Sequence, residues 1–155
     1  MDQSLTHIKM DTEINNGLKA FIVLGLYFLV LESLGLAQSA FLRIFNIIII
    51  VYFINKSIKY RIEEGRNFLS LFVSAFFTNL IAVIFSTISL AVYIAFFRGA
   101  DHMSTLAQPM LSIGHSNLSV SQFSFAIFAE GFASGVVLSF GLMQFWKNRT
   151  VNNPI

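Results

Sequence analysis

Residues 68–97 read FLSLFVSAFFTNLIAVIFSTISLAVYIAFF, a run without a single charged side chain. An α-helix rises about 1.5 Å per residue, so roughly 17 to 25 apolar residues cross the ~30 Å hydrocarbon core of a bilayer. The run is long enough to do so as one helix, with length left for tilt. It does not alternate between apolar and polar residues, as a strand of a membrane barrel would. We therefore predict an α-helical membrane protein.

The composition of the whole chain favours the same class of protein. Of its 155 residues, 55% are hydrophobic and only 12% are charged, whereas soluble domains carry about twice that share of charge. Three other apolar stretches, at about 20–38, 41–57 and 122–146, also reach spanning length. The sequence predicts one all-α membrane domain over residues 1–155, an integral bundle of four transmembrane helices at 20–38, 41–57, 68–97 and 122–146, with an outer loop at 99–121.

The basic residues predict how this bundle is oriented. Four spans place both termini and the link between the second and third spans on one side of the membrane. Two arginines, Arg43 and Arg98, fall near the other side. The remaining basic residues lie on the side of the termini: Lys9, Lys19, Lys56, Lys59, Arg61, Arg66, Lys147 and Arg149. Because cytoplasmic loops carry the excess of lysine and arginine, we expect both termini in the cytoplasm.

Small and polar residues recur every fourth position along the third span. Such a seam lets helix backbones approach closely and form hydrogen bonds that each contribute about 0.6 to 2 kcal/mol. We expect the seam to pack against other helices of the chain, with a polar conduction path as the alternative. Its members are Ser70, Ser74, Thr78, Ala82 and Ser86, with Asn79 beside them.

Two charged residues flank the tight turn predicted between the first two spans. Glu32 and Arg43 stand at nearly equal distances from residues 37 and 38, so a helical hairpin brings them to the same depth. An acid is tolerated in a bilayer when it is paired. We expect a structural ion pair between them near the outer boundary.

Glu130 is the second acid inside an apolar stretch, in FAEGFASGVVLSFG at 128–141. No lysine or arginine of its own helix lies near it, so its partner must come from elsewhere. Three roles remain open: it accepts hydrogen bonds from Asn79 or Thr78, it binds a coupling proton or cation, or it pairs with a basic group of another subunit.

The helix around Glu130 has two faces of small residues. At about 100° per residue, one face carries Ala133, Ser134, Val137 and Gly141 together with the acid. The other carries Gly131, Gly135 and Ser139, at a spacing that supports close helix packing.

No catalytic or metal-binding pattern is found. The three histidines, His7, His102 and His115, are far apart, and there is no cysteine. The sequence has neither a phosphate-binding Gly-Lys-Ser/Thr loop nor a His-Glu-x-x-His pattern. With a net charge of +2 and basic residues spread over helix ends, nucleic acid is not an expected partner. We expect a protein that is not an enzyme and holds no metal or cofactor.

Residues 47–97, from IIIIVYF to YIAFF, and FAEGFASGVVLSFGLMQFWK at 128–147 carry a resemblance to known proteins. An apolar span ending in basic residues and Tyr60, a short elbow around Gly65 and a third helix rich in small residues resemble a family of small four-helix bacterial inner-membrane proteins of unknown function. The resemblance implies a multi-pass protein of the bacterial inner (cytoplasmic) membrane. It implies no particular activity.

Two functions follow from these observations. The first is a non-enzymatic accessory or scaffold subunit of a larger inner-membrane complex, whose partners are the bilayer and either other membrane subunits or further copies of this chain. The alternative is a small ion- or proton-coupled transporter, in which Glu130 and Glu32 are the titrating sites.

Overall fold

The computed structural model describes residues 10–37, 39–99 and 119–152, apart from the side chains at 40, 43 and 147–152. Four long helices account for nearly all of these residues. They are α1 (Asp11–Ser33), α2 (Ala40–Glu63), α3 (Phe68–Tyr93), which continues into the short π-helix η1 (Ile94–Arg98), and α5 (Val120–Asn152). No strand occurs in the described part of the chain. The predicted all-helical fold is confirmed.

Three of the helices are long and apolar enough to cross a membrane: Asp11–Ser33, Phe68–Arg98 and Val120–Trp146. They support the membrane class of protein that the composition predicts. Within the described ranges, α2 is not among these three. Its second half carries Lys56, Lys59 and Arg61, which lower the mean hydropathy of that part of the helix.

The bounds of the first two helices differ from the predicted spans. Helix α1 begins at Asp11, well before residue 20, because polar residues of its first turns have partners inside the bundle. It stops at Ser33, before residue 38, and Gly35 then adopts a left-handed φ of 69° that continues no helix. Helix α2 runs past 57 to Glu63. The predicted outer loop, 99–121, lies outside the described residues over 100–118.

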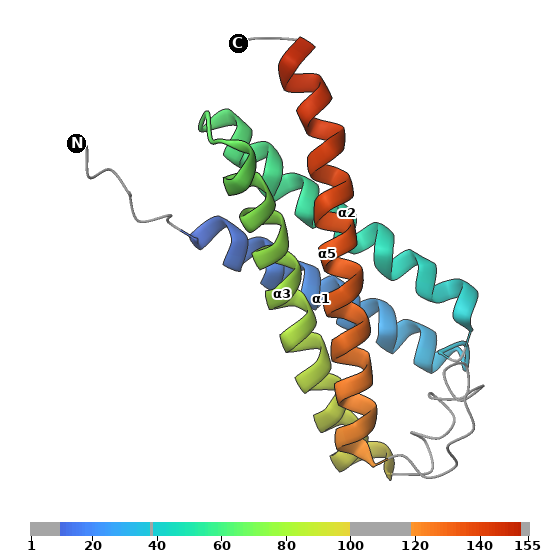
Figure 1. Ribbon diagram of the computed structural model, residues 1–155. Helices are drawn as coiled ribbons and strands as arrows, with labels where there is room; N and C mark the ends of the chain where they lie inside the picture. The colour runs from blue at the N-terminus through green and yellow to red at the C-terminus, as the bar shows by residue number, and fades with distance from the viewer. Residues whose placement is uncertain (1–9, 38, 100–118, 153–155) are drawn as a thin grey trace.

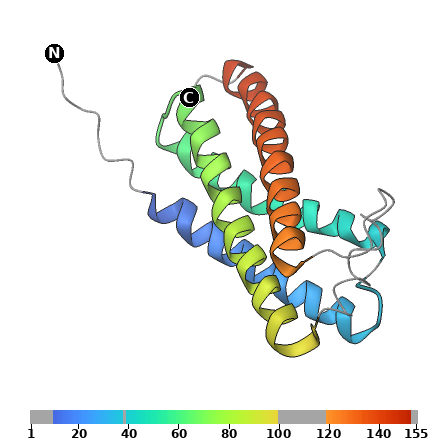
Figure 2. The same ribbon diagram turned by 60° about the horizontal axis from the view of Figure 1, so that its bottom comes forward.

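Helix α3 lies at the centre and packs against α1, α2 and α5 (Figure 1). Helices α1 and α2 form an antiparallel hairpin that crosses behind the pair formed by α3 and α5, as the turned view also shows (Figure 2). Successive helices alternate in direction. The start of α1, the end of α2, the start of α3 and the end of α5 therefore gather at one end of the bundle, here called the basic end.

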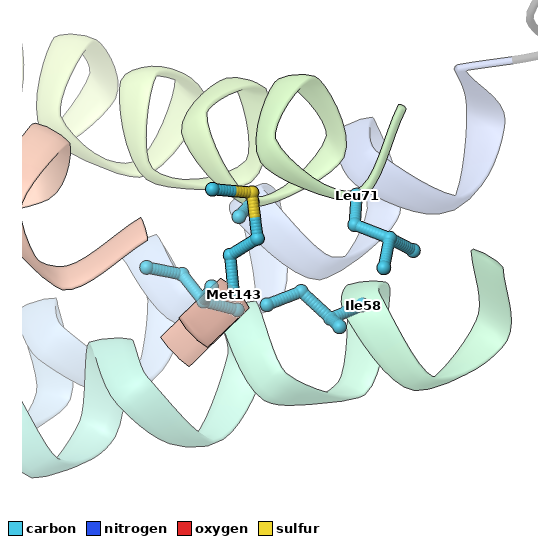
Figure 3. Close-up of a cluster of buried hydrophobic side chains, with 5 residues drawn as sticks. Ile58, Leu71 and Met143 are labelled. Carbon is cyan, nitrogen blue, oxygen red and sulfur yellow. The ribbon is translucent and has the colours of Figure 1, made fainter. Parts of the chain in front are cut away.

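The apolar core is divided along the bundle. Near the basic end, Ile58 of α2, Leu71 of α3 and Met143 of α5 pack together with Ile54 and Ala75 (Figure 3). A middle cluster of Ala20, Phe53 and Ala82 joins α1, α2 and α3, and one of Ala37, Ile94 and Phe123 closes the opposite end. Polar side chains fill the space between the helices beside these clusters, and they form the candidate sites.

Candidate functional site

A buried ion pair joins α1 to α2 at the basic end. Arg61 donates from Nε to Glu13 Oε1 at 2.7 Å and from Nη2 to Glu13 Oε2 at 2.9 Å. The guanidinium therefore forms a bidentate ion pair with the carboxylate. Both side chains are only 1% exposed. The Nη1 group of Arg61 donates to Glu64 Oε2 at 2.8 Å. This two-point geometry is the strongest form of ion pair that these residues make.

Hydrogen bonds extend this pair into α3. The hydroxyl of Ser74 donates to Glu13 Oε1, and Thr78 Oγ1 lies 2.8 Å from Ser57 Oγ and 2.9 Å from the carbonyl oxygen of Ser74. Asn16 Nδ2 donates to the same Ser57 Oγ at 2.9 Å. The network therefore ties α1, α2 and α3 together at one level. Ser74 and Thr78 were expected to face other helices, and here their partners are residues of α1 and α2.

The groups of this network bind one another and connect three helices. Both oxygens of Glu13 are engaged by Arg61, so neither is presented to a substrate or an ion. At its edge, the hydrogen bond from Arg61 lowers the pKa of the Glu64 carboxyl, which keeps that group ionised beside the guanidinium. The arrangement holds α1, α2 and α3 together.

Sequence reasoning missed Glu13, Asn16 and Arg61 as members of a site. Residues 10–19 look like a polar leader, and Arg61 looks like one more basic residue of a helix end. A signal was nevertheless present, because Glu13, Asn16, Gly17 and Ala20 follow the i, i+3, i+4, i+7 pattern of a helix face, and all four are buried.

Glycine lets α1 approach the seam of α3. A Cβ atom added to Gly17 would lie 2.8 Å from the carbonyl oxygen of Thr78 and 2.8 Å from Ile81 Cβ. The seam residues Ser74, Thr78 and Ala82 are buried in this region. Ser70 instead lies in the first turn, where its backbone N–H donates to the capping Asn67 Oδ1 at 3.2 Å.

The second small-residue face of α5 also packs against α3. A Cβ atom on Gly131 would lie 2.9 Å from Val83 Cγ1, and one on Gly135 would overlap the side-chain amide of Asn79. That amide donates from Nδ2 to the carbonyl oxygen of Gly131 at 3.3 Å. Ser139 is fully buried, one helical turn beyond Gly135.

Glu32 forms an ion pair with Arg98 of η1, the π-helix that continues α3. Arg98 donates from Nη2 to Glu32 Oε1 at 2.9 Å and from Nε to the hydroxyl of Tyr93 at 2.9 Å. The predicted partner, Arg43, has a side chain that lies outside the described residues. The ion pair between Glu32 and Arg98 thus connects the end of α1 to the end of η1.

Glu130 lies in a different environment from Glu13 and Glu32. It is exposed on a face of α5 that points away from α3, and no ion pair or hydrogen bond connects it to any described residue. Asn79 bonds to Gly131 instead, and Thr78 points toward α2. The first of the three expected roles, a hydrogen bond from Asn79 or Thr78, is therefore not the arrangement found in the structure.

The remainder of the Glu130 face is uncovered as well. Ala133, Ser134, Val137 and Gly141 are all exposed, and a Cβ atom added to Gly141 would meet nothing within 4 Å. At about 1.5 Å per residue, Glu130 lies roughly 15 Å from Val120 along α5, near the middle of the candidate span Val120–Trp146.

Neither a protein-family model, nor a curated protein, nor a solved structure matches this chain.

Proposed function

We propose that this protein is a non-enzymatic accessory or scaffold subunit of a larger complex in the bacterial inner membrane. The observation that carries the proposal is Glu130, an acid near the middle of a candidate spanning helix, on a face that the described part of its own chain leaves open. A carboxylate at the centre of a membrane helix costs about 2.5 to 3.5 kcal/mol on insertion scales when lipid surrounds it. A protein partner on that face would remove this cost.

The contrast with the other acids supports an external partner. Glu13 and Glu32 each have an arginine of the same chain within 2.9 Å. The fold thus supplies cations to these two acids and to Glu64, and supplies none of its described cations to Glu130. An acid that has no partner among the described residues is what a subunit interface would require.

We propose further that α2 is a fourth crossing and that both termini are cytoplasmic. One exposed face of α2 carries Phe41, Phe45, Ile48 and Tyr52 and then changes to the exposed Lys56. Apolar side chains followed by an aromatic residue and then lysine are typical of a lipid-facing helix whose lysine reaches toward the headgroups. The basic end would accordingly be the cytoplasmic end.

Photocrosslinking in native membranes tests the proposed function. A photoreactive amino acid at Val137, on the Glu130 face, is expected to form adducts with one membrane protein. The matched control is Ile88 of α3, an exposed apolar position, which is expected to react with lipid. Adducts with lipid alone at both positions, together with a solitary chain in mild detergent by native mass measurement, would count decisively against a subunit role.

A second candidate function, a small ion- or proton-coupled transporter, is favoured by one observation. The buried atoms Asn79 Oδ1, Ser86 Oγ, Thr87 Oγ1 and Ser139 Oγ have no hydrogen-bond partner among the described residues. Water or an ion beside these atoms would satisfy them. Proton or cation flux in proteoliposomes that disappears in Glu130→Gln would support the transporter, and absence of flux under every imposed gradient would reject it.

A further inference from the structure

We infer that the partner of the Glu130 face is a transmembrane helix that carries a lysine or an arginine at the depth of Glu130. The Glu130 face comprises Glu130, Ala133, Ser134, Val137 and Gly141. The inference rests on the proposed function and goes further, because it specifies the chemistry and the shape of the occupant.

Charge is the first reason. Glu130 has no ion pair with any described residue, and Arg61, Arg66 and Arg98 form ion pairs with other acids. Arg61 is committed to Glu13, and Arg98 to Glu32. A basic group from outside, at the same depth, would form a charge-assisted hydrogen bond to the carboxylate. In the absence of water, such a bond offsets the cost of placing each of the two charges in the membrane.

Shape is the second reason, and the glycines of α5 show it. Gly131 and Gly135 have no space for a Cβ atom because α3 fills it, whereas Gly141 has open space around it. Gly141 and the two other small residues of the Glu130 face therefore serve no close contact within the described chain. They would allow the backbone of another helix to approach α5 closely.

A second copy of this chain fits the Glu130 face poorly. Packing α5 against α5 through this face would bring two carboxylates together, and like charges in contact repel. A basic helix of a different protein is the occupant that satisfies the charge.

A host–guest binding experiment tests the surface directly. The full chain is reconstituted in phosphatidylcholine vesicles and titrated with a fluorescent synthetic Leu/Ala transmembrane helix that carries Lys, Gln or Leu at its centre. Energy transfer is expected to show the Lys helix binding about tenfold more tightly than the Leu helix, as one added charge-assisted hydrogen bond predicts. This preference should disappear in Glu130→Gln and be retained in Glu32→Gln, whose acid is already paired.

Gly141→Leu provides a second, charge-neutral variant. Since nothing lies within 4 Å of a Cβ atom there, the fold should be unaffected while binding of the Lys helix weakens. Equal binding of the Lys and Leu helices to the wild-type protein, or a Lys preference that survives Glu130→Gln, would overturn the inference. So would a homodimer in native mass measurements that dissociates in Glu130→Gln, because the occupant would then be a second copy.

The two proposals can fail separately. A Lys preference in vesicles without any crosslinked protein at Val137 in native membranes would support the surface chemistry and reject the subunit role. A crosslinked partner without a Lys preference would support the subunit role and reject the inference.

Discussion

The guanidinium of Arg61 lies against the carboxylate of Glu13, 48 residues earlier in the chain, with bonds of 2.7 and 2.9 Å between two side chains that are both 1% exposed. Neither charge would be tolerated alone in this position, because an unpaired buried ion is costly. The pair therefore fixes how the start of α1 meets the end of α2. With Ser74 donating to the same carboxylate, the position of α3 is fixed as well.

Replacing Glu13 by Ala should destabilise the protein strongly. The change leaves the Arg61 guanidinium buried without its main partner, and breaking a buried pair in this way costs about 3 to 5 kcal/mol. Unfolding in mixed micelles, followed by circular dichroism during an SDS titration, measures the loss. Lys59→Ala, at an exposed position of α2, is the control and should change stability by less than about 0.5 kcal/mol. Equal effects of the two variants would show that the pair contributes little.

Two glycines of α5 should respond differently to the same substitution. Gly135→Ala places a methyl group in the space of the Asn79 amide, and overpacking of this kind costs about 1 to 3 kcal/mol. Gly141→Ala meets open space and should leave the stability of the monomer unchanged or slightly higher, because alanine favours helix. Both are measured by the same SDS titration. If Gly141→Ala proved as damaging as Gly135→Ala, the packing of α3 on α5 described here would be wrong.

The all-helical class and the third span can be predicted from the sequence, because a long uncharged apolar run fits a membrane-spanning helix and few other structures. Residues 68–97 contain no charge, and α3 with η1 covers 68–98. The start of α1 could not be placed in the same way. Glu13 and Asn16 lower the hydropathy of residues 11–19, and only their partners Arg61 and Ser57, supplied by tertiary structure, make them suitable for a helix interior.

The contacts of the candidate site are harder to predict from the sequence than the bounds of the helices. Spacing along one helix identifies which residues share a face, as with Gly131, Gly135 and Ser139, but it does not identify the helix opposite. Glu32 illustrates this point, because one of its partners is Arg98, which is 66 residues away and lies on a helix that the spacing around Glu32 does not indicate. Pairing across helices depends on crossing geometry, which no periodicity within one segment records.

Acid should weaken the protein partly through Glu64. The hydrogen bond from Arg61 lowers the folded-state pKa of this carboxyl below its usual 4.5. The resulting stabilisation is present above pH about 4.5 and is lost as the pH falls through the lower, folded-state pKa. The stability difference between wild type and Glu64→Gln should therefore shrink below pH about 4. Unfolding midpoints between pH 6 and 3 measure it, with the exposed neighbour Glu63→Gln as the control.

The contact between Glu32 and Arg98 should show a small coupling energy. Arg98 is 47% exposed, so solvent screens the pair, and exposed pairs contribute about 0.2 to 1 kcal/mol. A double-mutant cycle with Glu32→Gln and Arg98→Gln measures it. A parallel cycle with Arg43→Gln tests the pair expected from the hairpin. A larger coupling to Arg43 than to Arg98 would establish Arg43 as the main partner of Glu32.

Single cysteines test the proposed topology, and the chain contains no native cysteine that would interfere. If α2 crosses the membrane, Glu64→Cys and Ser119→Cys lie on opposite sides. A membrane-impermeant maleimide added to intact spheroplasts should then label Ser119→Cys, while Glu64→Cys should react only after the membrane is permeabilised. Gly35→Cys, in the turn before α2, should behave like Ser119→Cys. Equal labelling of Gly35→Cys and Glu64→Cys would mean that α2 does not cross, because both of its ends would then lie on the same side of the membrane.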